Sequence, residues 1–241
     1  MARASDFVFL HGGVQGSWVW DDAIAALRRI GGDRVGQCLA LDVPGCGAKR
    51  GRDTSALSFE DIVRDLLADI DAAGLRTPVL VGHSQAGTVL PRLIAARPGL
   101  FRRVIYISCV APEHGETVVA GTVGDEPEKH PADQAGMFAL MKSMFCNDMD
   151  ETATMAFAAN LGQDAWPPAA YVETKWRYDH LAAIPATYVK CARDAAVTRE
   201  KQELCASRLK VDRIREVDSG HQLMNSQPRL LAEVLLAEAV D

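Results

Sequence analysis

One stretch of the sequence, residues 77–87 (TPVLVGHSQAG), constrains the fold more than any other. Its apolar run at 79–81 is short, rich in valine and bounded by proline and glycine, which is typical of a buried strand. A helical pattern of apolar residues begins directly afterwards. Ser84 therefore stands in a tight turn between a buried strand and a helix. Small residues are needed on both sides of it, and Gly82 and Ala86 occupy those places.

A serine in such a turn is typical of a nucleophile elbow, which exposes the hydroxyl for attack. Two plainer interpretations stay open from this stretch alone: a glycine-rich turn with an exposed serine, and a turn that binds an anion. The usual elbow has glycine at the second position after the serine. This chain has Ala86 there, with Gly87 one residue further on.

Strand-like apolar runs alternate with helical patterns along most of the chain. This alternation predicts a mainly parallel six-stranded sheet with helices on both faces, which is an α/β fold. The predicted strands are 6–10, 34–43, 79–81, 103–109, 185–191 and 212–217, and the predicted helices include 21–30, 58–73, 199–209 and a last one from 227.

The alternation stops between residues 112 and 183. A connection of this length is too long to lack structure of its own, and it contains apolar residues at helical spacing, such as Met141, Met144 and Phe145. We therefore expect a core domain made of 1–111 and 184–241, with 112–183 inserted as a helical cap.

Composition limits the possible classes of protein. A length of 241 residues, 48% hydrophobic and 24% charged, predicts one globular domain that is a monomer or a homodimer. The net charge of −6 argues against a nucleic-acid partner. The sequence has no apolar run of about 18 residues for a membrane span and no room for a signal peptide before the first strand, so we expect a cytoplasmic protein.

The cysteines and histidines do not indicate a metal site. The six cysteines have no CxxC pairing, which favours free thiols in a reducing compartment. The six histidines lack metal-ligand spacing, and no glycine-rich phosphate loop occurs. We expect neither a metal nor a cofactor, and a small-molecule substrate as the partner.

A serine nucleophile needs a base, and the base needs an acid that orients it. His221 follows the last predicted strand, at the edge of the sheet where ligands bind in open α/β folds. Asp194 follows the preceding strand and is the preferred acid, because its loop adjoins the histidine loop. Asp218 and Glu113 are rival acids. Either His221 or Asp194 could instead be an ordinary loop residue.

The loop after the first strand, which begins His11-Gly12-Gly13, leaves backbone N–H groups free to bind an oxygen. An oxyanion hole needs two such donors. We expect them from Gly13 and from Gln85, the residue after the serine, with Gly12 and His83 at the same site. His83 is interpreted as a packing or pocket-wall residue rather than a second base.

Basic residues gather in a loop that contains Lys49, Arg50 and Arg52. They could attract an acidic substrate. A run of charges in a loop is more often simply solvated.

Five segments together resemble the α/β-hydrolase superfamily. The nearest branch is that of the plant methyl esterases and hydroxynitrile lyases and their bacterial esterase relatives. The resemblance implies a triad of Ser84, Asp194 and His221, oxyanion donors Gly13 and Gln85, and a cap between the fourth strand and the acid strand. The segments are 11–20 (HGGVQGSWVW), 42–47 (DVPGCG), 82–87 (GHSQAG), 193–194 (RD) and 220–221 (GH).

Lyases of that branch resemble the esterases but carry threonine after the first-loop histidine and lysine after the catalytic histidine. This chain has Gly12 and Gln222 at those positions. We therefore expect a serine hydrolase, a carboxylic ester hydrolase that acts on small, fairly apolar esters and on lactones. The alternative is a cofactor-free lyase, isomerase or cyclase that uses His221 as a general base. A non-catalytic receptor on the same fold is the third hypothesis.

Overall fold

A parallel β-sheet forms the centre of the computed structural model, which describes residues 4–123 and 134–239. The sheet order is β2-β1-β3-β4-β5-β6, and each of the five pairings is parallel. The predicted six-stranded parallel sheet is thus confirmed. The strands are β1 Ser5–Leu10, β2 Val35–Leu41, β3 Val79–His83, β4 Arg103–Ile107, β5 Ala186–Cys191 and β6 Arg213–Val217.

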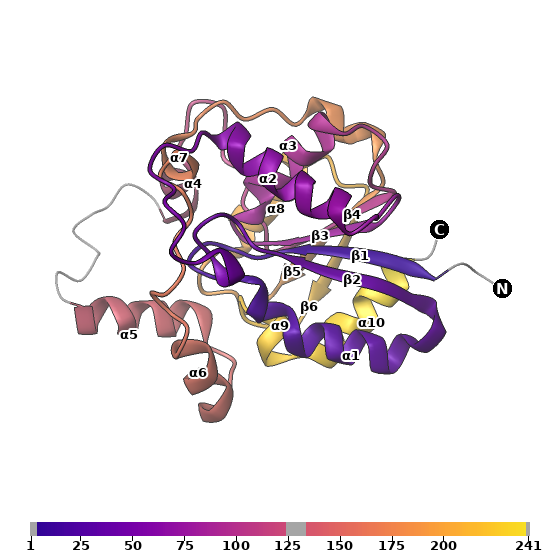
Figure 1. Ribbon diagram of the computed structural model, residues 1–241. Helices are drawn as coiled ribbons and strands as arrows, with labels where there is room; N and C mark the ends of the chain where they lie inside the picture. Colours follow the sequence, from indigo (N-terminus) through magenta and orange to yellow (C-terminus); the bar gives the residue numbers. More distant parts are fainter. Residues whose placement is uncertain (1–3, 124–133, 240–241) are drawn as a thin grey trace.

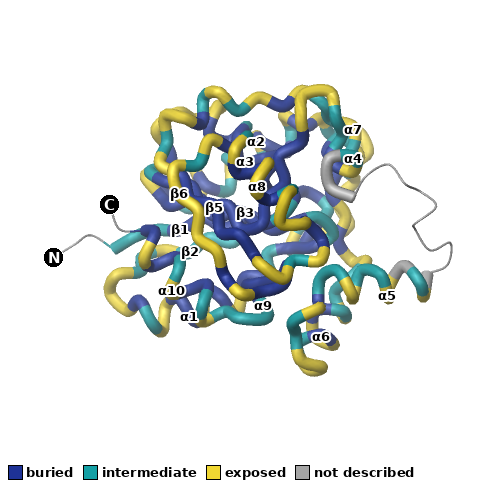
Figure 2. The backbone as a smooth tube through the Cα atoms, turned by 180° about the vertical axis from the view of Figure 1, so that it is seen from behind, coloured by how far each residue is buried: buried dark blue, intermediate teal, exposed yellow. Residues whose placement is uncertain are grey.

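Helices cover both faces of this sheet (Figure 1). Successive strand residues point to opposite faces, so Phe7 and Phe9 lie in one buried cluster, while Val8 and Leu10 lie in the other. Figure 2 shows the buried strands between the two helical layers. The Phe7 face is covered by α1 (Asp21–Gly31) and α10 (Pro228–Glu238), and the Val8 face by α2 (Phe59–Ala72), α3 (Ala86–Ala96) and α8 (Arg199–Arg208).

Local sequence signals explain the helix ends. Ser58 caps α2, because its side chain accepts a hydrogen bond from the Asp61 N–H while the Asp61 carboxylate accepts one from the Ser58 N–H. On the opposite face of the sheet, α1 extends through Gly31. It is followed by Gly32 at φ +52°, a conformation that glycine adopts readily.

Short helices fill the connection between β4 and β5. Together with the loops between them, they form the segment expected to be a cap, and α5 and α6 project from one side of the sheet (Figure 1). Residues 124–133 of that segment, and 1–3 and 240–241 of the expected core domain, lie outside the described residues. The helices are α4 Val118–Val123, α5 Gln134–Phe145, α6 Glu151–Ala158, α7 Ala169–Val172 and a 3₁₀ turn at Asp179–Ala183.

The basic loop before α2 is held in ion pairs. Lys49 and Arg52 both bind Asp65 on α2. Arg50 binds the carboxylate of Asp164 through two nitrogens, at 2.7 and 2.6 Å. The side chain of Asp164 is fully buried and also accepts from the indole N–H of Trp18 at 2.9 Å. Arg50 therefore ties the inserted segment to the core.

No helix within residues 4–123 and 134–239 is long and apolar enough to cross a membrane. All six cysteines are free thiols, and five of them are buried. Within the same ranges, no cluster of histidine, cysteine and carboxylate side chains could hold a metal ion.

Candidate active site

The predicted site residues follow the carboxyl ends of four strands of the parallel sheet. Gly13 follows β1, Ser84 follows β3, Asp194 follows β5 and His221 follows β6. Because these strands are parallel members of one sheet, in which β4 lies between β3 and β5, their carboxyl ends meet at one edge. Residues far apart in the sequence are thereby brought to one place.

Ser84 occupies a strained and firmly held turn. Its φ is +53°, in the left-handed region that non-glycine residues rarely adopt. Its N–H donates to the carbonyl of Ile107 at 3.1 Å, and its carbonyl accepts from the N–H groups of Gly87 and Val110, each at 3.0 Å. These three bonds hold the strain and fix the direction of the side chain.

Close packing explains the small residues around this turn. A Cβ on Gly82 would lie 2.6 Å from a methyl group of Leu90 and 3.1 Å from the Cβ of Ala86. A Cβ on Gly87 would lie 2.3 Å from the carbonyl oxygen of Val110, which is backbone and cannot move aside. Glycine is therefore required at 82 and 87, whereas the buried methyl group of Ala86 fits.

The side chains of His221 and Asp194 form a buried pair. Nδ1 of His221 donates to Oδ2 of Asp194 at 2.7 Å, and the two side chains are 1% and 0% exposed. The Ser108 hydroxyl donates to the same oxygen. The other oxygen, Oδ1, accepts from the N–H groups of Ala196 and Val197 at 2.7 and 2.8 Å. All of the acceptor positions of this carboxylate are thus occupied, and Nε2 of the imidazole is left for other partners.

The surroundings keep Asp194 ionised. Burial alone would raise its pKa, but the adjacent His221 and the hydrogen bonds from His221, Ser108 and Val197 outweigh that effect. The pKa of Asp194 is therefore lowered from its ordinary value. A carboxylate in this state fixes the imidazole with its proton on Nδ1.

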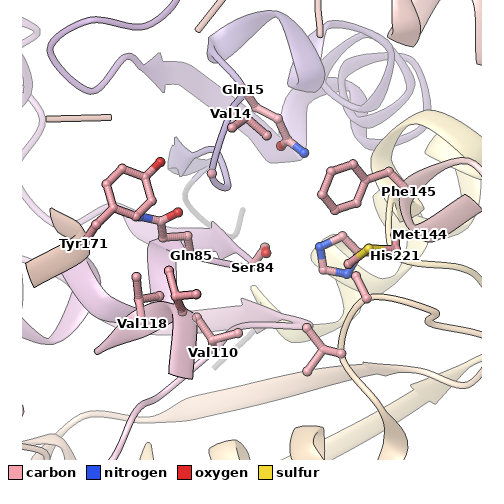
Figure 3. A pocket seen from close by; sticks show the side chains of 14 residues that line it. Val14, Gln15, Ser84, Gln85, Val110, Val118, Met144, Phe145, Tyr171 and His221 are labelled. Carbon is pink, nitrogen blue, oxygen red and sulfur yellow. The ribbon is translucent and has the colours of Figure 1, made fainter. Parts of the chain in front are cut away.

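Ser84 and His221 both line a cavity of about 190 Å³ (Figure 3). The Ser84 hydroxyl makes no hydrogen bond to any described residue. Hydrogen bonds between a nucleophile and its base are often long or poorly aligned without substrate and tighten when substrate binds. None of the described lining residues is a lysine, arginine, aspartate or glutamate. The lining residues are Gly13, Val14, Gln15, Ser84, Gln85, Val110, Val118, Val119, Met144, Phe145, Tyr171, Ala196, Val197 and His221.

Gly13 and Gln85 lie at the same cavity, as expected of oxyanion donors. Neither backbone N–H donates to an acceptor in the described part of the chain. Gln85 is the N-cap of α3, so its N–H adds to the positive end of the helix dipole. A Cβ on Gly13 would lie 2.3 Å from Oε1 of Gln85, so the two residues are adjacent.

Gly12 and His83 lie behind the cavity rather than in its wall. A Cβ on Gly12 would lie 3.0 Å from both Nδ1 of His83 and Cβ of Ser84. Nε2 of His83 donates to the carbonyl oxygen of His221 at 3.0 Å. Burial, and then the nearby His221, lower the pKa of His83 well below its ordinary value. His83 is thus a neutral side chain that holds the backbone of His221.

The two rival acids lie away from the imidazole. Asp218 has a side chain that is 83% exposed and pairs with Arg193 at 2.7 Å. Glu113 is 68% exposed and pairs with Arg208 at 2.8 Å. Of the three candidates, it is Asp194 that contacts His221.

Some site residues were not found by sequence reasoning. Ser108, which binds Asp194, follows β4 directly and has φ +42°. Its place at the carboxyl end of a strand was the available signal. Phe145 stacks on the His221 imidazole, with ring centres 5.5 Å apart and an angle of 26°. Of the four described non-glycine residues with positive φ, three border this site, namely Val14, Ser84 and Ser108.

Comparison with known proteins identifies the family. A model described as the alpha/beta hydrolase family matches residues 7–234, so the chain belongs to that family. It is 23% identical over 261 residues to the rice esterase PIR7B, covering 95% of this chain and 94% of that protein. It is 33% identical over 116 residues to a carbendazim-hydrolysing esterase of Nocardioides sp. (strain SG-4G), a match that spans 48% of this chain and 46% of that protein.

Solved structures share this fold. An extracellular alpha/beta-hydrolase from a Paenibacillus species, described as homologous to tobacco salicylic acid binding protein 2, superimposes with a TM-score of 0.79 at 21% identity, covering 98% of this chain and all of that one. Polyneuridine aldehyde esterase superimposes with a TM-score of 0.78 at 19% identity, with the same coverage. The named relatives in these comparisons include plant and bacterial esterases, which matches the branch that the sequence motifs indicated.

Proposed function

We propose that this protein is a carboxylic ester hydrolase that works through an acyl-enzyme on Ser84. The observation that carries the proposal is the buried His221–Asp194 pair at 2.7 Å, whose imidazole lines the same cavity as Ser84. The esterase names of relatives in the same branch support it.

In the proposed mechanism, Nε2 of His221 takes the proton of Ser84 while the serine oxygen attacks the ester carbonyl. Asp194 holds the imidazole in the required tautomer and stabilises its positive form. The N–H groups of Gly13 and Gln85 bind the negative oxygen that develops, and each such donor contributes about 10²–10³ in rate. His221 then protonates the departing alcohol.

Deacylation repeats these steps with water. His221 removes a proton from the water, which attacks the acyl-serine, and the serine leaves with the proton returned by the imidazole. The same N–H groups of Gly13 and Gln85 stabilise the second tetrahedral intermediate. The acid product is released and the free Ser84 is regenerated.

The cavity favours small, apolar substrates, including lactones. Its described walls are mostly valine, methionine and aromatic side chains, and none of them is a lysine, arginine, aspartate or glutamate. Several of them, including Val118, Met144, Phe145 and Tyr171, come from the inserted segment. We therefore propose that 112–183 acts as a cap that shapes the acyl and alcohol pockets over the core domain of 1–111 and 184–241.

Two positions favour hydrolysis over the lyase chemistry of related proteins. A Cβ on Gly12 would already crowd Ser84, at 3.0 Å from its Cβ, so the threonine of the lyase pattern does not fit here without a shift. Gln222, which replaces the lysine of that pattern, is fully buried and does not line the cavity.

The direct test compares wild type and Ser84→Ala on a short-chain nitrophenyl ester, with labelling by a fluorophosphonate. We expect turnover and stoichiometric labelling of wild type at Ser84, and neither in the variant. Equal turnover by both proteins would exclude the acyl-enzyme. Turnover of a substrate without a covalent adduct at Ser84 would instead support a lyase or isomerase with His221 as the base.

A further inference from the structure

A buried carboxylate of the inserted segment contacts the loop that carries His221. The side chain of Asp148, just after α5, is 1% exposed. Its Oδ2 accepts a hydrogen bond from the N–H of Gly220 at 2.6 Å and one from the hydroxyl of Ser219 at 3.1 Å. Gly220 directly precedes His221, so this carboxylate binds the Ser219–Gly220 peptide group, one residue before the histidine.

The neighbouring residue contacts the loop that carries the acid. Nδ2 of Asn147 donates to the carbonyl oxygen of Arg193 at 2.7 Å, and Arg193 directly precedes Asp194. The guanidinium of Arg193 also lies 3.8 Å from Asp148 and is paired with Asp218. Two adjacent residues of the inserted segment therefore bind both of the loops that form the His221–Asp194 pair.

The fit between the segment and the histidine loop is close. A Cβ on Gly220 would lie 2.2 Å from Oδ1 of Asn147 and 2.5 Å from Oδ1 of Asp148, so only glycine allows this approach. Phe145, two residues before Asn147, stacks on the imidazole of His221. The backbone just before His221 and the ring of His221 are thus both contacted from the same short stretch, 145–148.

We propose that Asp148 is a positioning residue for His221, acting through the Gly220 N–H and the Ser219 hydroxyl. Asp148 does not line the cavity, so it has no direct contact with substrate. Without its oxygen the Gly220 N–H lies buried and unpaired, which favours movement of the loop to find another partner. A displacement of about 1 Å at a catalytic group can cost about 10²-fold in rate. This inference rests on the proposed function of Ser84 and His221.

Two variants separate position from charge. Asp148→Ala removes both hydrogen bonds, and we expect kcat per active site to fall about 10- to 100-fold with little change in KM. Asp148→Asn keeps an oxygen for Gly220, and its new amide N–H can donate to Asn147, so we expect kcat within about threefold of wild type.

A matched control lies two residues away. Asp150 is exposed and caps α6, accepting from the Ala153 N–H at 2.8 Å. Asp150→Ala removes a carboxylate from the same segment without touching either loop. We expect its kcat per active site to equal that of wild type, because its effect is confined to the stability of α6.

The readouts distinguish positioning from folding. Rates are divided by the number of sites that a fluorophosphonate titrates, so that misfolded protein does not count. Proton NMR of the His221 Nδ1–H bonded to Asp194 supplies a measure that needs no substrate, and we expect Asp148→Ala to shift or broaden this resonance while Asp148→Asn and Asp150→Ala preserve it.

Three outcomes overturn the inference: unchanged rates and resonance in Asp148→Ala, equal losses in Asp148→Asn and Asp148→Ala, or an equal loss in Asp150→Ala. If wild type itself neither turns over esters nor labels at Ser84, the proposed function fails. The resonance then still decides whether Asp148 positions His221.

Discussion

Replacing Asp194 by asparagine tests the acid–base pair with little change of shape. Oδ1 of Asp194 accepts from the N–H groups of Ala196 and Val197, which can only donate. The amide oxygen of an asparagine must therefore stay on that side, and its NH₂ group must face His221 and Ser108. The Ser108 hydroxyl can turn and accept. The imidazole can accept only if its proton moves from Nδ1 to Nε2.

That change of tautomer sets the size of the effect. With its proton on Nε2, His221 cannot take the proton of Ser84, and the comparable substitution in serine proteases lowers kcat by about 10⁴. We expect Asp194→Asn to lose about 10³–10⁴ in kcat, equivalent to about 4–5.5 kcal/mol of transition-state stabilisation. The bonds from Ala196 and Val197 are kept, so the loop should hold its conformation.

The assay is the pH dependence of kcat/KM on a nitrophenyl ester, with thermal unfolding to show that the variant is folded. Asp218→Asn is the matched control, since Asp218 is 83% exposed and its pair with Arg193 contributes little. We expect its kcat/KM within about twofold of wild type, as for an exposed ion pair. A folded Asp194→Asn with a tenth of wild-type activity, or an equal loss in Asp218→Asn, would refute the assignment of the acid.

Further predictions concern stability and thiol reactivity. Asp164→Ala should lower the free energy of unfolding in urea by about 1.5–3 kcal/mol, because it removes the buried acceptor of the partly exposed Arg50 and of the Trp18 N–H. The pKa of Asp164 is lowered because hydrogen bonds from Arg50 and Trp18 outweigh the effect of burial, so its contribution is present above the ordinary carboxyl pKa and is lost as pH falls through the folded value. Wild type should therefore lose more stability than Asp164→Ala below about pH 4. The free energy of unfolding of Ser84→Gly should exceed that of Ser84→Ala by about 1 kcal/mol, because glycine adopts φ +53° without strain. Both variants should be inactive. Ellman's reagent should modify at most Cys38 in the native protein and all six thiols after unfolding, because the other five are buried and burial raises their pKa values, that of Cys146 to about 11.

The fold, and the meeting of the candidate site residues at one edge of the sheet, were predictable because they depend on local patterns and one topological rule. Short apolar runs identify the strands, and the carboxyl ends of adjacent parallel strands must meet at one edge. Ser84, Asp194 and His221 each follow such a run, so their proximity could be inferred without knowing any distance. Asp194 is preferred to Asp218 on a second ground, because the acid that orients the histidine is expected in the loop next to the histidine loop.

The contacts made by the inserted segment could not be predicted in this way. In the sequence, Asp148 is one of several acidic residues near the start of a helix. Its burial depends on how α5 and α6 pack against the histidine loop, which the sequence does not show. Phe145 has the spacing of an ordinary core residue, yet it stacks on His221. No periodicity in the chain encodes the orientation of this segment relative to the sheet.

The turn at Ser84 shows that the glycines of a motif are best understood from the steric contacts that require them. The usual pattern requires glycine two residues after the serine, and Ala86 departs from it. In the structure a Cβ added at Gly82 would lie 3.1 Å from the Ala86 methyl group, so the methyl group fits because residue 82 is glycine, whereas Gly87 lies against the backbone of Val110. That same backbone donates its N–H to the Ser84 carbonyl. A side chain at 87 would therefore push away the segment after β4 that holds the strained serine, so this turn needs Gly87, which lies outside the motif, as well as Gly82, which lies within it.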